Sequence, residues 1–473
     1  MTIIKAKDFT EKLSKAGHVR YTKQNASLGK YGPKNPKIIS LGLGDPRPDT
    51  FIFSEVSATV ANLYNKDGSS DSTDSAQTTI SLSEKKSPGS LVEGLDVLLQ
   101  YGDGYGVRSL LGYAKNLVKN SHCPQYEDWD VIISCGSTDG LDKATDVFLN
   151  DGDNIIVDEY TYINAIKTFE AKSYNQVSVG MDTEGMIPEE LDRVCSNWQG
   201  PNPLKAIYLI PTGQNPTGTT MSLQRRKDIY SVCQKHDLII IEDDPYYYIQ
   251  FGDAPVADGE TTLSPEYLSK LPGTKNLLPS MLLFDVDGRV IRLDSMSKLM
   301  APNLRTGWIT AQKRVIDIIR AHTDTTLIRA NGLSMGLLSR LLLEEWKEEG
   351  FEKHVAFVQK QYVYRRNLLV KSMKERLGNM IEFSVPETGM FVWLKVNLPD
   401  EAKREGVVDE LFEKMTEKNM LMIPGFLFSA DQKNPNVKDI PYFRATFVYA
   451  PLEELDMAIE RLETVLLEFG CKK

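Results

Sequence analysis

Short apolar runs alternate along the chain with longer stretches in which apolar residues recur every three or four positions. Apolar runs of about four to eight residues are typical of strands buried on both faces, whereas the longer period is typical of amphipathic helices. The predicted strands are Val131–Ser134, Asn154–Val157, Ala206–Ile210, Leu238–Ile241, Val290–Leu293 and Gly307–Thr310. Helical periodicity lies between several of them, for example over 140–149 and 223–236. This alternation predicts an α/β fold with a mostly parallel central sheet.

The last third of the chain has a different pattern. Helical periodicity runs from Arg314 to Gly350 and, after this glycine, over Phe351–Leu377. Two shorter strand-like pieces follow, at Met390–Val396 and Tyr442–Tyr449. We therefore expect a large α/β domain and a smaller α+β domain to which the N-terminus also contributes. The expected limits are an N-terminal arm and part of the small domain over 1–60, the large domain over 61–345, and the C-terminal small domain over 346–473.

One segment, 65–90, stands apart by composition, because Ser, Thr and Asp dominate it and Pro88-Gly89 lies near its end. Such a segment has little apolar surface to bury, so it is predicted to be an exposed, flexible insertion in the large domain. The chain as a whole has the composition of a globular protein, since 41% of its 473 residues are hydrophobic and 25% are charged. It can therefore bury a large core without disulfides or metal ions.

Charge and cysteine content narrow the classes of function. Asp and Glu (65) outnumber Lys and Arg (55), and the net charge of −10 argues against nucleic acid or an anionic membrane as the main partner. The five cysteines are scattered and the five histidines lack ligand spacing, so neither a disulfide framework nor a metal site is expected. No apolar run approaches ~18 residues and 1–20 has no secretory signal, so we expect a cytoplasmic protein without membrane contact.

Polar residues follow several of the predicted strands, and ligands in open α/β sheets bind beyond the carboxyl ends of the strands. Gly136, Ser137 and Thr138 come after the first run and open a helix, so their backbone N–H groups can bind an anion. Taken alone, such a turn is more often an ordinary capped helix. The loop Pro211–Gly218 and the acidic segment Glu242–Tyr247 follow two further runs. Acids at a buried strand end are costly unless they meet a cation, although solvated acids on a loop are an equally good interpretation.

The fifth run leads into Ser295-Met296-Ser297-Lys298, and Arg305 follows seven residues after the lysine. Surface lysines are common, so the motif means little by itself. A lysine at a strand end, between hydroxyl groups and an arginine, is nevertheless a candidate for a covalently bound amine beside a phosphate.

Together, and in this order, these motifs resemble those of the fold-type I, class I pyridoxal-phosphate aminotransferases. The resemblance extends from about residue 38 to the C-terminus and rests on Asn215–Gly218, Asp243–Tyr247, Ser295–Lys298 and Phe443-Arg444. Within this family the chain is most similar to the fungal aromatic-amino-acid aminotransferases and to the kynurenine/2-aminoadipate aminotransferases. The segments that carry this narrower match are Pro211–Gly218, Glu242–Tyr247, Asp285–Arg292 and Gly389–Phe391. The resemblance implies an aspartate-aminotransferase-like fold with pyridoxal 5'-phosphate as cofactor.

The resemblance also implies a role for each site residue. Lys298 resembles the lysine that holds the cofactor as an internal aldimine and moves the proton on the way to a pyridoxamine-phosphate intermediate. Asp244 is expected to pair with the pyridinium nitrogen, and Tyr247 to hydrogen-bond the phenolic oxygen together with Asn215. The other expected cofactor ligands are Gly136, Ser137, Thr138, Ser295, Ser297 and Arg305 at the phosphate and Tyr162 stacked on the ring.

On the substrate side, Arg444 resembles the arginine that binds the α-carboxylate, since a guanidinium matches two carboxylate oxygens. Gly44 matches the N-terminal segment that closes over the substrate. The residue that Asn215 matches also contacts the substrate in the family. Tyr101 matches a tyrosine that reaches the phosphate from the partner subunit, so the family implies a homodimer with shared active sites. Arg329 has two interpretations, contact with an acidic substrate side chain or pairing at the dimer interface, and we favour the second.

The implied activity is transamination of aromatic L-amino acids, with 2-oxoglutarate or an aromatic 2-oxo acid as the second substrate. The alternative is amino transfer from 2-aminoadipate or kynurenine by the same mechanism. A third hypothesis, a regulator built on the same fold, requires a DNA-binding domain ahead of the aminotransferase part. Fewer than about forty residues precede the family match, below the roughly 50 of a typical domain, which disfavours this hypothesis.

Overall fold

The computed structural model describes residues 4–23, 39, 41–42, 44–61, 77–252, 265–431 and 434–473. The strands of the main sheet are β3 (Trp129–Ser134), β4 (Asn154–Asp158), β5 (Asn175–Val179), β8 (Leu204–Leu209), β9 (Ile239–Asp243), β10 (Val290–Ser295) and β11 (Gly307–Gln312). Their order in this seven-stranded sheet is β3-β11-β10-β9-β8-β4-β5. β10 is parallel to β9, and β4 is parallel to β5 and β8, whereas β11 is antiparallel to β10 and β3. The predicted α/β fold with a mostly parallel sheet is confirmed.

All six predicted strands are present, and most of their residues are buried. β4, β9 and β11 are buried at every position, as their continuous apolar runs indicated. The sequence prediction missed β5, because Asn175–Val179 is largely polar and is fully buried only at Val179. β5 is the last strand in the sheet order, and an edge strand has a neighbour on one side only, so its apolar pattern is weaker.

The chain divides into two compact units, and neither is continuous in sequence. Unit 1 comprises Met1–Asn150, Ile239–Pro245 and Pro279–His354, and unit 2 comprises Asp151–Leu238, Tyr246–Leu278 and Val355–Lys473. These limits differ from those of the predicted domains, and the division into 1–60, 61–345 and 346–473 stays a prediction.

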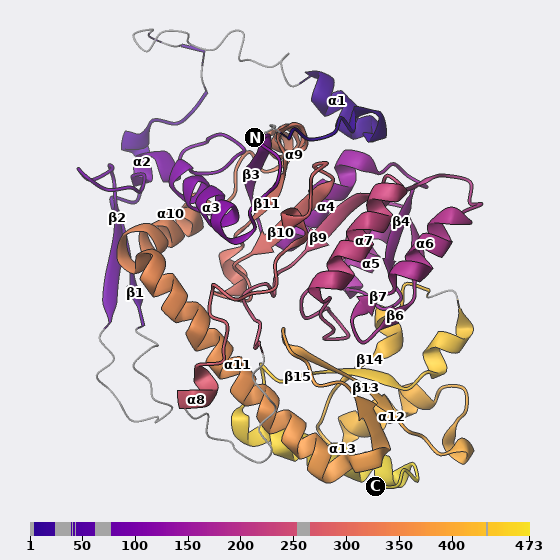
Figure 1. Ribbon diagram of the computed structural model, residues 1–473. Coiled ribbons are helices and arrows are strands. Elements are labelled where there is room, and N and C mark those ends of the chain that lie inside the picture. Colours follow the sequence, from indigo (N-terminus) through magenta and orange to yellow (C-terminus); the bar gives the residue numbers. More distant parts are fainter. Residues whose placement is uncertain are drawn as a thin grey trace. The chain divides into compact units, whose positions relative to one another are not determined.

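In unit 1, helices cover the strands β3, β10 and β11. The helices are α1 (Lys15–Lys23), α2 (Leu95–Leu98), α3 (Arg108–Ser121), α4 (Ser137–Phe148), α9 (Lys313–Thr326) and α10 (Gly332–Ser339). α3 and α9 pack against β3, and α4 packs against β10, as Figure 1 shows. The predicted helix over 140–149 is therefore present as α4, which begins three residues earlier at Ser137.

A two-stranded hairpin, β1 (Glu55–Val60) with β2 (Thr78–Ser83), also belongs to unit 1 and contacts α10 through β2 (Figure 1). Ile80 and Leu82 of β2 are buried, with 4% and 3% of their surface exposed. The expected exposed insertion over 65–90 is therefore wrong for Thr78–Ser83, while 62–76 lie outside the described residues. The Ser- and Thr-rich composition concealed a strand whose alternate residues are apolar.

The long helical region is interrupted, but not where the sequence suggested. After α10 come a π-helix, η8 (Arg340–Trp346), and α11 (Lys347–Leu377), which continues through Gly350. The predicted break at this glycine is wrong, because one glycine costs a helix only about 1 kcal/mol. A Cβ at Gly350 would lie 2.6 Å from the Cβ of Trp346, so the glycine permits close packing. The breaks occur instead where Ile328 (φ 63°) and Lys347 (φ 53°) adopt left-handed backbone conformations.

Unit 2 contains the strands β4, β5 and β8, a short hairpin and a second sheet. Its helices are α5 (Ile163–Ala171), α6 (Pro188–Ser196), α7 (Leu223–Lys235), α8 (Pro265–Leu268), α12 (Val407–Glu417) and α13 (Leu452–Glu468). The hairpin pairs β6 (Met181–Asp182) with β7 (Gly185–Met186). The second sheet has the order β12 (Ile381–Phe383), β13 (Phe391–Val396), β15 (Tyr442–Thr446), β14 (Ile423–Pro424), and all its pairs are antiparallel. Within the described ranges, no helix is long and apolar enough to cross a membrane.

Candidate active site

Several of the predicted phosphate-binding residues of unit 1 come together at the N-terminus of α4. Gly136, with φ 91°, turns the chain from β3 into this helix, and a Cβ there would lie 2.7 Å from Nη2 of Arg305. The Arg305 guanidinium donates to the Cys135 carbonyl (2.6 Å) and to Ser297 Oγ (3.3 Å). The open N–H groups and the positive dipole end of a helix attract an anion. A glycine, an arginine, a serine and a helix N-terminus thus form a turn suited to binding an anion.

Ser137 provides a test of whether a phosphate group fits this turn. Its Oγ is buried and has no hydrogen-bond partner among the described residues. Buried hydroxyl groups nearly always have a partner, so this atom is suited to a ligand oxygen. Thr138 lies beside it in the first turn of α4 and is exposed. The residues present therefore fit a bound phosphate group.

Lys298 lies in the turn that follows β10 and is half-buried. The turn is held at its start, because the Met296 N–H donates to the Thr306 carbonyl at 3.0 Å. Ser295 Oγ accepts a hydrogen bond from the Ser297 N–H (3.1 Å), so this hydroxyl shapes the turn that carries the lysine. The predicted amine and Ser297 are thus neighbours in the same turn, and Ser297 contacts Arg305.

Asp244 follows β9 in unit 1 and is 1% exposed. Its Oδ2 accepts a hydrogen bond from Nη1 of Arg292 at 3.1 Å. The sequence reasoning missed Arg292, whose guanidinium is fully buried and also pairs with Glu242 and Asp294. A charged residue inside the apolar strand Val290–Leu293 was the signal that could have identified it.

In unit 2, the predicted carboxylate-binding arginine is oriented by an amide and two aromatic rings. Nη1 of Arg444, on β15, donates to Oδ1 of Asn215 at 2.7 Å. The guanidinium carbon lies 4.5 Å from the ring centre of Phe391 and 4.7 Å from that of Phe428. Burial lowers the pKa of Arg444 from its usual value, although a guanidinium remains protonated in proteins. Neither phenylalanine was predicted as a site residue.

The loop Pro211–Gly218 that carries Asn215 crosses another backbone segment very closely. A Cβ at Gly213 (φ 56°) would lie 2.6 Å from the Cα of Gly389, so both positions require glycine. Asn215 is 5% exposed. Tyr247, also of unit 2, is 4% exposed and packs edge-to-face on Tyr248.

Asp158, at the end of β4, is a buried acid that the sequence reasoning passed over. Gln214 Nε2 donates to its Oδ2 at 3.3 Å and to the Tyr160 carbonyl at 2.6 Å. Gln214 Oε1 in turn accepts from the N–H and hydroxyl of Thr217. Burial raises the pKa of Asp158 to about 7, against the smaller lowering by the Gln214 hydrogen bond. Asp158 therefore supports the loop that carries Asn215. Tyr162, four residues later, accepts a hydrogen bond on its hydroxyl from Asn164 (2.9 Å).

Three predicted residues lie in less buried parts of unit 1. Tyr101 is 59% exposed. Arg329 donates from Nη2 to the carbonyls of Val97, Leu98 and Gln100, at 2.9, 3.1 and 2.6 Å, and so caps α2 and the segment before Tyr101. Gly44 is exposed, and no heavy atom lies within 4 Å of the position of a Cβ there. The structure thus assigns Arg329 a backbone-capping contact, and its two expected roles stay predictions.

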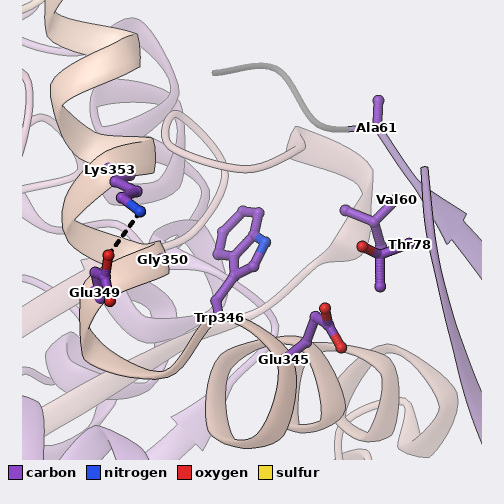
Figure 2. Close-up of a pocket in the computed structure, with 8 residues that line it drawn as sticks. All are labelled: Val60, Ala61, Thr78, Glu345, Trp346, Glu349, Gly350 and Lys353. Atoms are coloured by element: carbon purple, nitrogen blue, oxygen red, sulfur yellow. Dashed lines mark ion pairs between the residues drawn. The ribbon is translucent and has the colours of Figure 1, made fainter. Parts of the chain in front are cut away.

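A cavity of about 330 Å³ opens elsewhere in unit 1, between the β1–β2 hairpin and the junction of η8 with α11 (Figure 2). It is lined by Val60, Ala61, Thr78, Glu345, Trp346, Glu349, Gly350 and Lys353. Figure 2 shows the Trp346 indole between the strand residues and the Glu349–Lys353 ion pair, whose side chains are 79% and 57% exposed. The lining includes none of the predicted site residues, so this cavity is not the candidate active site.

Comparison with known proteins identifies the family. The sequence matches the family of class I and II aminotransferases over residues 93–462. It is 37% identical to an aromatic amino acid aminotransferase of Schizosaccharomyces pombe, over 93% of each chain. It is 32% identical to the bovine mitochondrial kynurenine/alpha-aminoadipate aminotransferase, over 92% of this chain and 93% of that one. The crystal structure of aminotransferase Aro8 from Candida albicans superposes with a TM-score of 0.86 at 32% identity, covering 99% of this chain and all of that one.

The predicted resemblance and fold are thereby confirmed. The family match covers most of the chain and includes the turn with Lys298, the loop with Asn215, and the arginines Arg305 and Arg444. The anion-binding turn and the unpartnered Ser137 hydroxyl fit the phosphate of the family's cofactor. The protein belongs to the class I and II aminotransferase family, whose members use pyridoxal 5'-phosphate.

Proposed function

We propose that this protein transfers the amino group of aromatic L-amino acids to 2-oxoglutarate or to an aromatic 2-oxo acid. The observation that carries the proposal is Arg444, which is held by Asn215 and is in contact with the rings of Phe391 and Phe428. A guanidinium binds an amino-acid carboxylate, and the flanking aromatic rings favour an aromatic side chain. The aromatic amino acid aminotransferase of Schizosaccharomyces pombe, 37% identical, supports the same substrate class.

In the proposed mechanism, unit 1 binds and activates the cofactor. Arg305, Ser297 and the N-terminus of α4 hold its phosphate, and Asp244 holds the protonated ring nitrogen. Pyridoxal phosphate, when bound, supplies an acceptor for the electrons of the broken Cα–H bond. With the cofactor bound, the Lys298 amine would hold it and would act as the base that takes the proton from the substrate Cα and later gives it up.

Unit 2 is proposed to orient the substrate and the face of the ring. Arg444 binds the α-carboxylate, and Asn215 holds the guanidinium in place. With the cofactor bound, Tyr162 would stack on its ring, and Tyr247 and Asn215 would donate hydrogen bonds to its phenolic oxygen.

The remaining assignments concern the assembly and the N-terminal segment. We propose a homodimer in which Tyr101 reaches the partner's phosphate site, since this tyrosine is 59% exposed in the single chain. Ile39 and Leu41 are 91% and 97% exposed, which fits a segment around Gly44 that packs only against substrate or partner. All five cysteines are free, which fits a reducing compartment such as the cytoplasm.

A second candidate function is amino transfer from 2-aminoadipate or kynurenine. The bovine kynurenine/alpha-aminoadipate aminotransferase, 32% identical over most of both chains, favours it. The chemistry of the lysine is the same in both cases, so only the binding of the substrate side chain differs.

The test is the absorption spectrum of the purified protein before and after L-phenylalanine is added without any oxo acid. Loss of the visible band of the lysine-bound cofactor, with a stoichiometric amount of phenylpyruvate, is the expected result. A visible band that L-phenylalanine leaves unchanged but L-2-aminoadipate or L-kynurenine removes would favour the second function. Absence of a band after incubation with pyridoxal phosphate would refute both.

A further inference from the structure

Four ionisable side chains converge beneath the proposed cofactor site in unit 1. Glu242 lies near the end of β9 and Asp244 directly follows this strand, whereas Arg292 and Asp294 belong to β10. The two strands are parallel, and Arg292 lies opposite Glu242 in the register. Residues two apart on a strand share a face, so all four side chains lie on one face of the sheet.

Arg292 is the centre of this cluster. Its Nη1 lies 3.1 Å from Glu242 Oε1 and 3.1 Å from Asp244 Oδ2. Its Nε and Nη2 bind Asp294 from the other side, at 3.1 and 2.8 Å to Oδ1. The side chains of Arg292, Glu242 and Asp244 have no exposed surface and that of Asp294 has 5%. A planar guanidinium with donors in fixed directions therefore sets the orientation of each carboxylate.

One further group, His122, contributes to the electrostatics of the cluster. His122 Nε2 lies 3.8 Å from Asp294 Oδ1, and burial together with Arg292 holds the pKa of His122 well below its usual value. His122 is therefore neutral at physiological pH. Burial raises the pKa of Asp294, while Arg292 acts in the opposite direction. Arg292 is thus the positive charge among these five side chains.

We propose that Arg292 is a positioning residue for the cofactor: it holds the Asp244 carboxylate in the orientation that the cofactor's ring nitrogen requires. The inference rests on the proposed function, which gives Asp244 this partner. Arg292 does not touch the cofactor in this proposal and acts only through Asp244. The Asp294 carboxylate, bound to both Nε and Nη2, keeps the guanidinium from rotating away.

The test compares two cofactors bound to cofactor-free protein: pyridoxal phosphate and its analogue with carbon in place of the ring nitrogen. The analogue has no nitrogen to pair with Asp244, so the position of that carboxylate should not affect its binding. In Arg292→Lys the charge remains, but the fork that binds Glu242, Asp244 and Asp294 together is lost. We expect the affinity for pyridoxal phosphate to fall about tenfold or more and that for the analogue to change less than about twofold.

Arg289→Lys is the matched control. Arg289 lies just before the same strand, its side chain is 1% exposed, and it pairs with Asp287 at 2.8 Å. It is at the strand end opposite Lys298, so its variant should lose stability without a selective loss of pyridoxal phosphate. Thermal unfolding of the cofactor-free variants measures this structural cost separately from cofactor affinity.

Three outcomes would overturn the inference. An equal loss of affinity for both cofactors would mean that Arg292 only stabilises the fold, and no loss would mean that Asp244 does not depend on it. Wild-type protein that does not bind pyridoxal phosphate would refute the proposed function itself, and the inference with it. If Arg292→Lys does not fold, Asp294→Asn replaces it in the test, because this change loosens the Arg292 guanidinium without removing it. It should give a smaller loss of affinity that is again selective for pyridoxal phosphate. An equal loss for both cofactors in this variant would also overturn the inference.

Discussion

The two units each contain an arginine near the proposed chemistry, Arg292 buried and Arg444 half-buried, and the surroundings of the two differ. Arg292 in unit 1 has no exposed side-chain surface and pairs with three of the protein's own carboxylates. Arg444 in unit 2 contacts one amide oxygen and two aromatic rings, and among the described residues no carboxylate lies within ion-pair distance of it. An arginine bound by the protein's own acids fixes the positions of those acids. An arginine held by an amide and rings keeps donors for the acid of a ligand.

Under the proposed function, Arg292 acts on the cofactor through Asp244, and Arg444 binds the substrate carboxylate. Substitution of one of these arginines should therefore change one property and leave the other. The expected effects below run from the largest to the smallest.

Lys298→Ala should have the largest effect, because it removes the amine that moves the proton. Turnover of L-phenylalanine should fall at least about 10⁴-fold. L-Phenylalanine should still bind, since Arg444 in unit 2 is unchanged. Measuring phenylpyruvate formation and substrate binding on the same sample separates these effects. Lys313→Ala, which removes a lysine paired with Asp317 on α9, is the control and should keep full turnover; comparable turnover in the two variants would contradict the assignment of Lys298.

Arg444→Lys should raise KM for L-phenylalanine about 100-fold, since an ammonium cannot bind two carboxylate oxygens and interact with two rings as a guanidinium does. The affinity for pyridoxal phosphate should remain unchanged. Steady-state kinetics and cofactor titration test both statements. Arg461→Lys is the matched control, since Arg461 is a half-buried arginine of unit 2 whose guanidinium binds the Asn419 carbonyl. A loss of cofactor affinity as large as the rise in KM would break the division between the units.

Asp158→Asn tests whether the buried Asp158 carboxyl group supports the loop Pro211–Gly218, through the pH dependence of the free energy of unfolding. Burial raises the pKa of Asp158 from 3.8 to about 7 in the folded protein. Ionisation is thus disfavoured in the folded state, so the wild type loses stability as pH rises from about 4 to about 7 and no further above it. The variant should be more stable than the wild type at pH 8, by up to about 4 kcal/mol, and the difference should shrink towards pH 4.

Urea unfolding at several pH values measures this difference. Asp456 provides a control of opposite sign, because hydrogen bonds from Arg376 and Ser372 lower its pKa to about 2. Asp456→Asn should therefore lose stability at neutral pH and regain parity with the wild type as pH falls through about 2. A pH-independent difference for Asp158→Asn would show that this carboxyl group is not buried in its neutral form.

Arg329→Ala should have the smallest effect on specificity. Its Nη2 donates to three backbone carbonyls around the end of α2, so the variant should lose about 1–3 kcal/mol of stability. The ratio of kcat/KM for L-phenylalanine and L-2-aminoadipate should change less than about twofold. A large loss confined to 2-aminoadipate would instead assign Arg329 to an acidic substrate side chain and favour the second function.

The sequence predicted best those strands that are buried along their whole length, because their residues are mostly apolar. β4 and β9 are buried throughout, and their apolar runs were recognised within two residues of their observed limits. The Ser- and Thr-rich strand β2 and the polar edge strand β5 were missed. Each strand is only partly buried, so few of its residues are apolar. Periodicity reports burial, and it fails where burial is partial.

The site residues also divide into those that sequence motifs identified and those that they missed. The order and spacing of the motifs around Gly136, Lys298 and Arg305 were sufficient for the resemblance to the family, because a phosphate and a covalent amine favour those residue types beside strand ends. Spacing could not identify Arg292, since its role depends on three carboxylates that only the register of β9 and β10 brings to it. It could not identify Asp158 either, since nothing local indicates that this acid is buried beside Gln214.

By itself, then, the sequence determined the fold class, the family and the order of the motifs, because these follow from local periodicity and from residue types at strand ends. The tertiary structure alone decided which side chains form ion pairs. It surrounds Arg292 with three carboxylates and places Arg444 against two aromatic rings. Those properties depend on contacts between residues such as Asn215 and Arg444, more than two hundred positions apart, whose energies arise from burial and direction rather than from sequence neighbours.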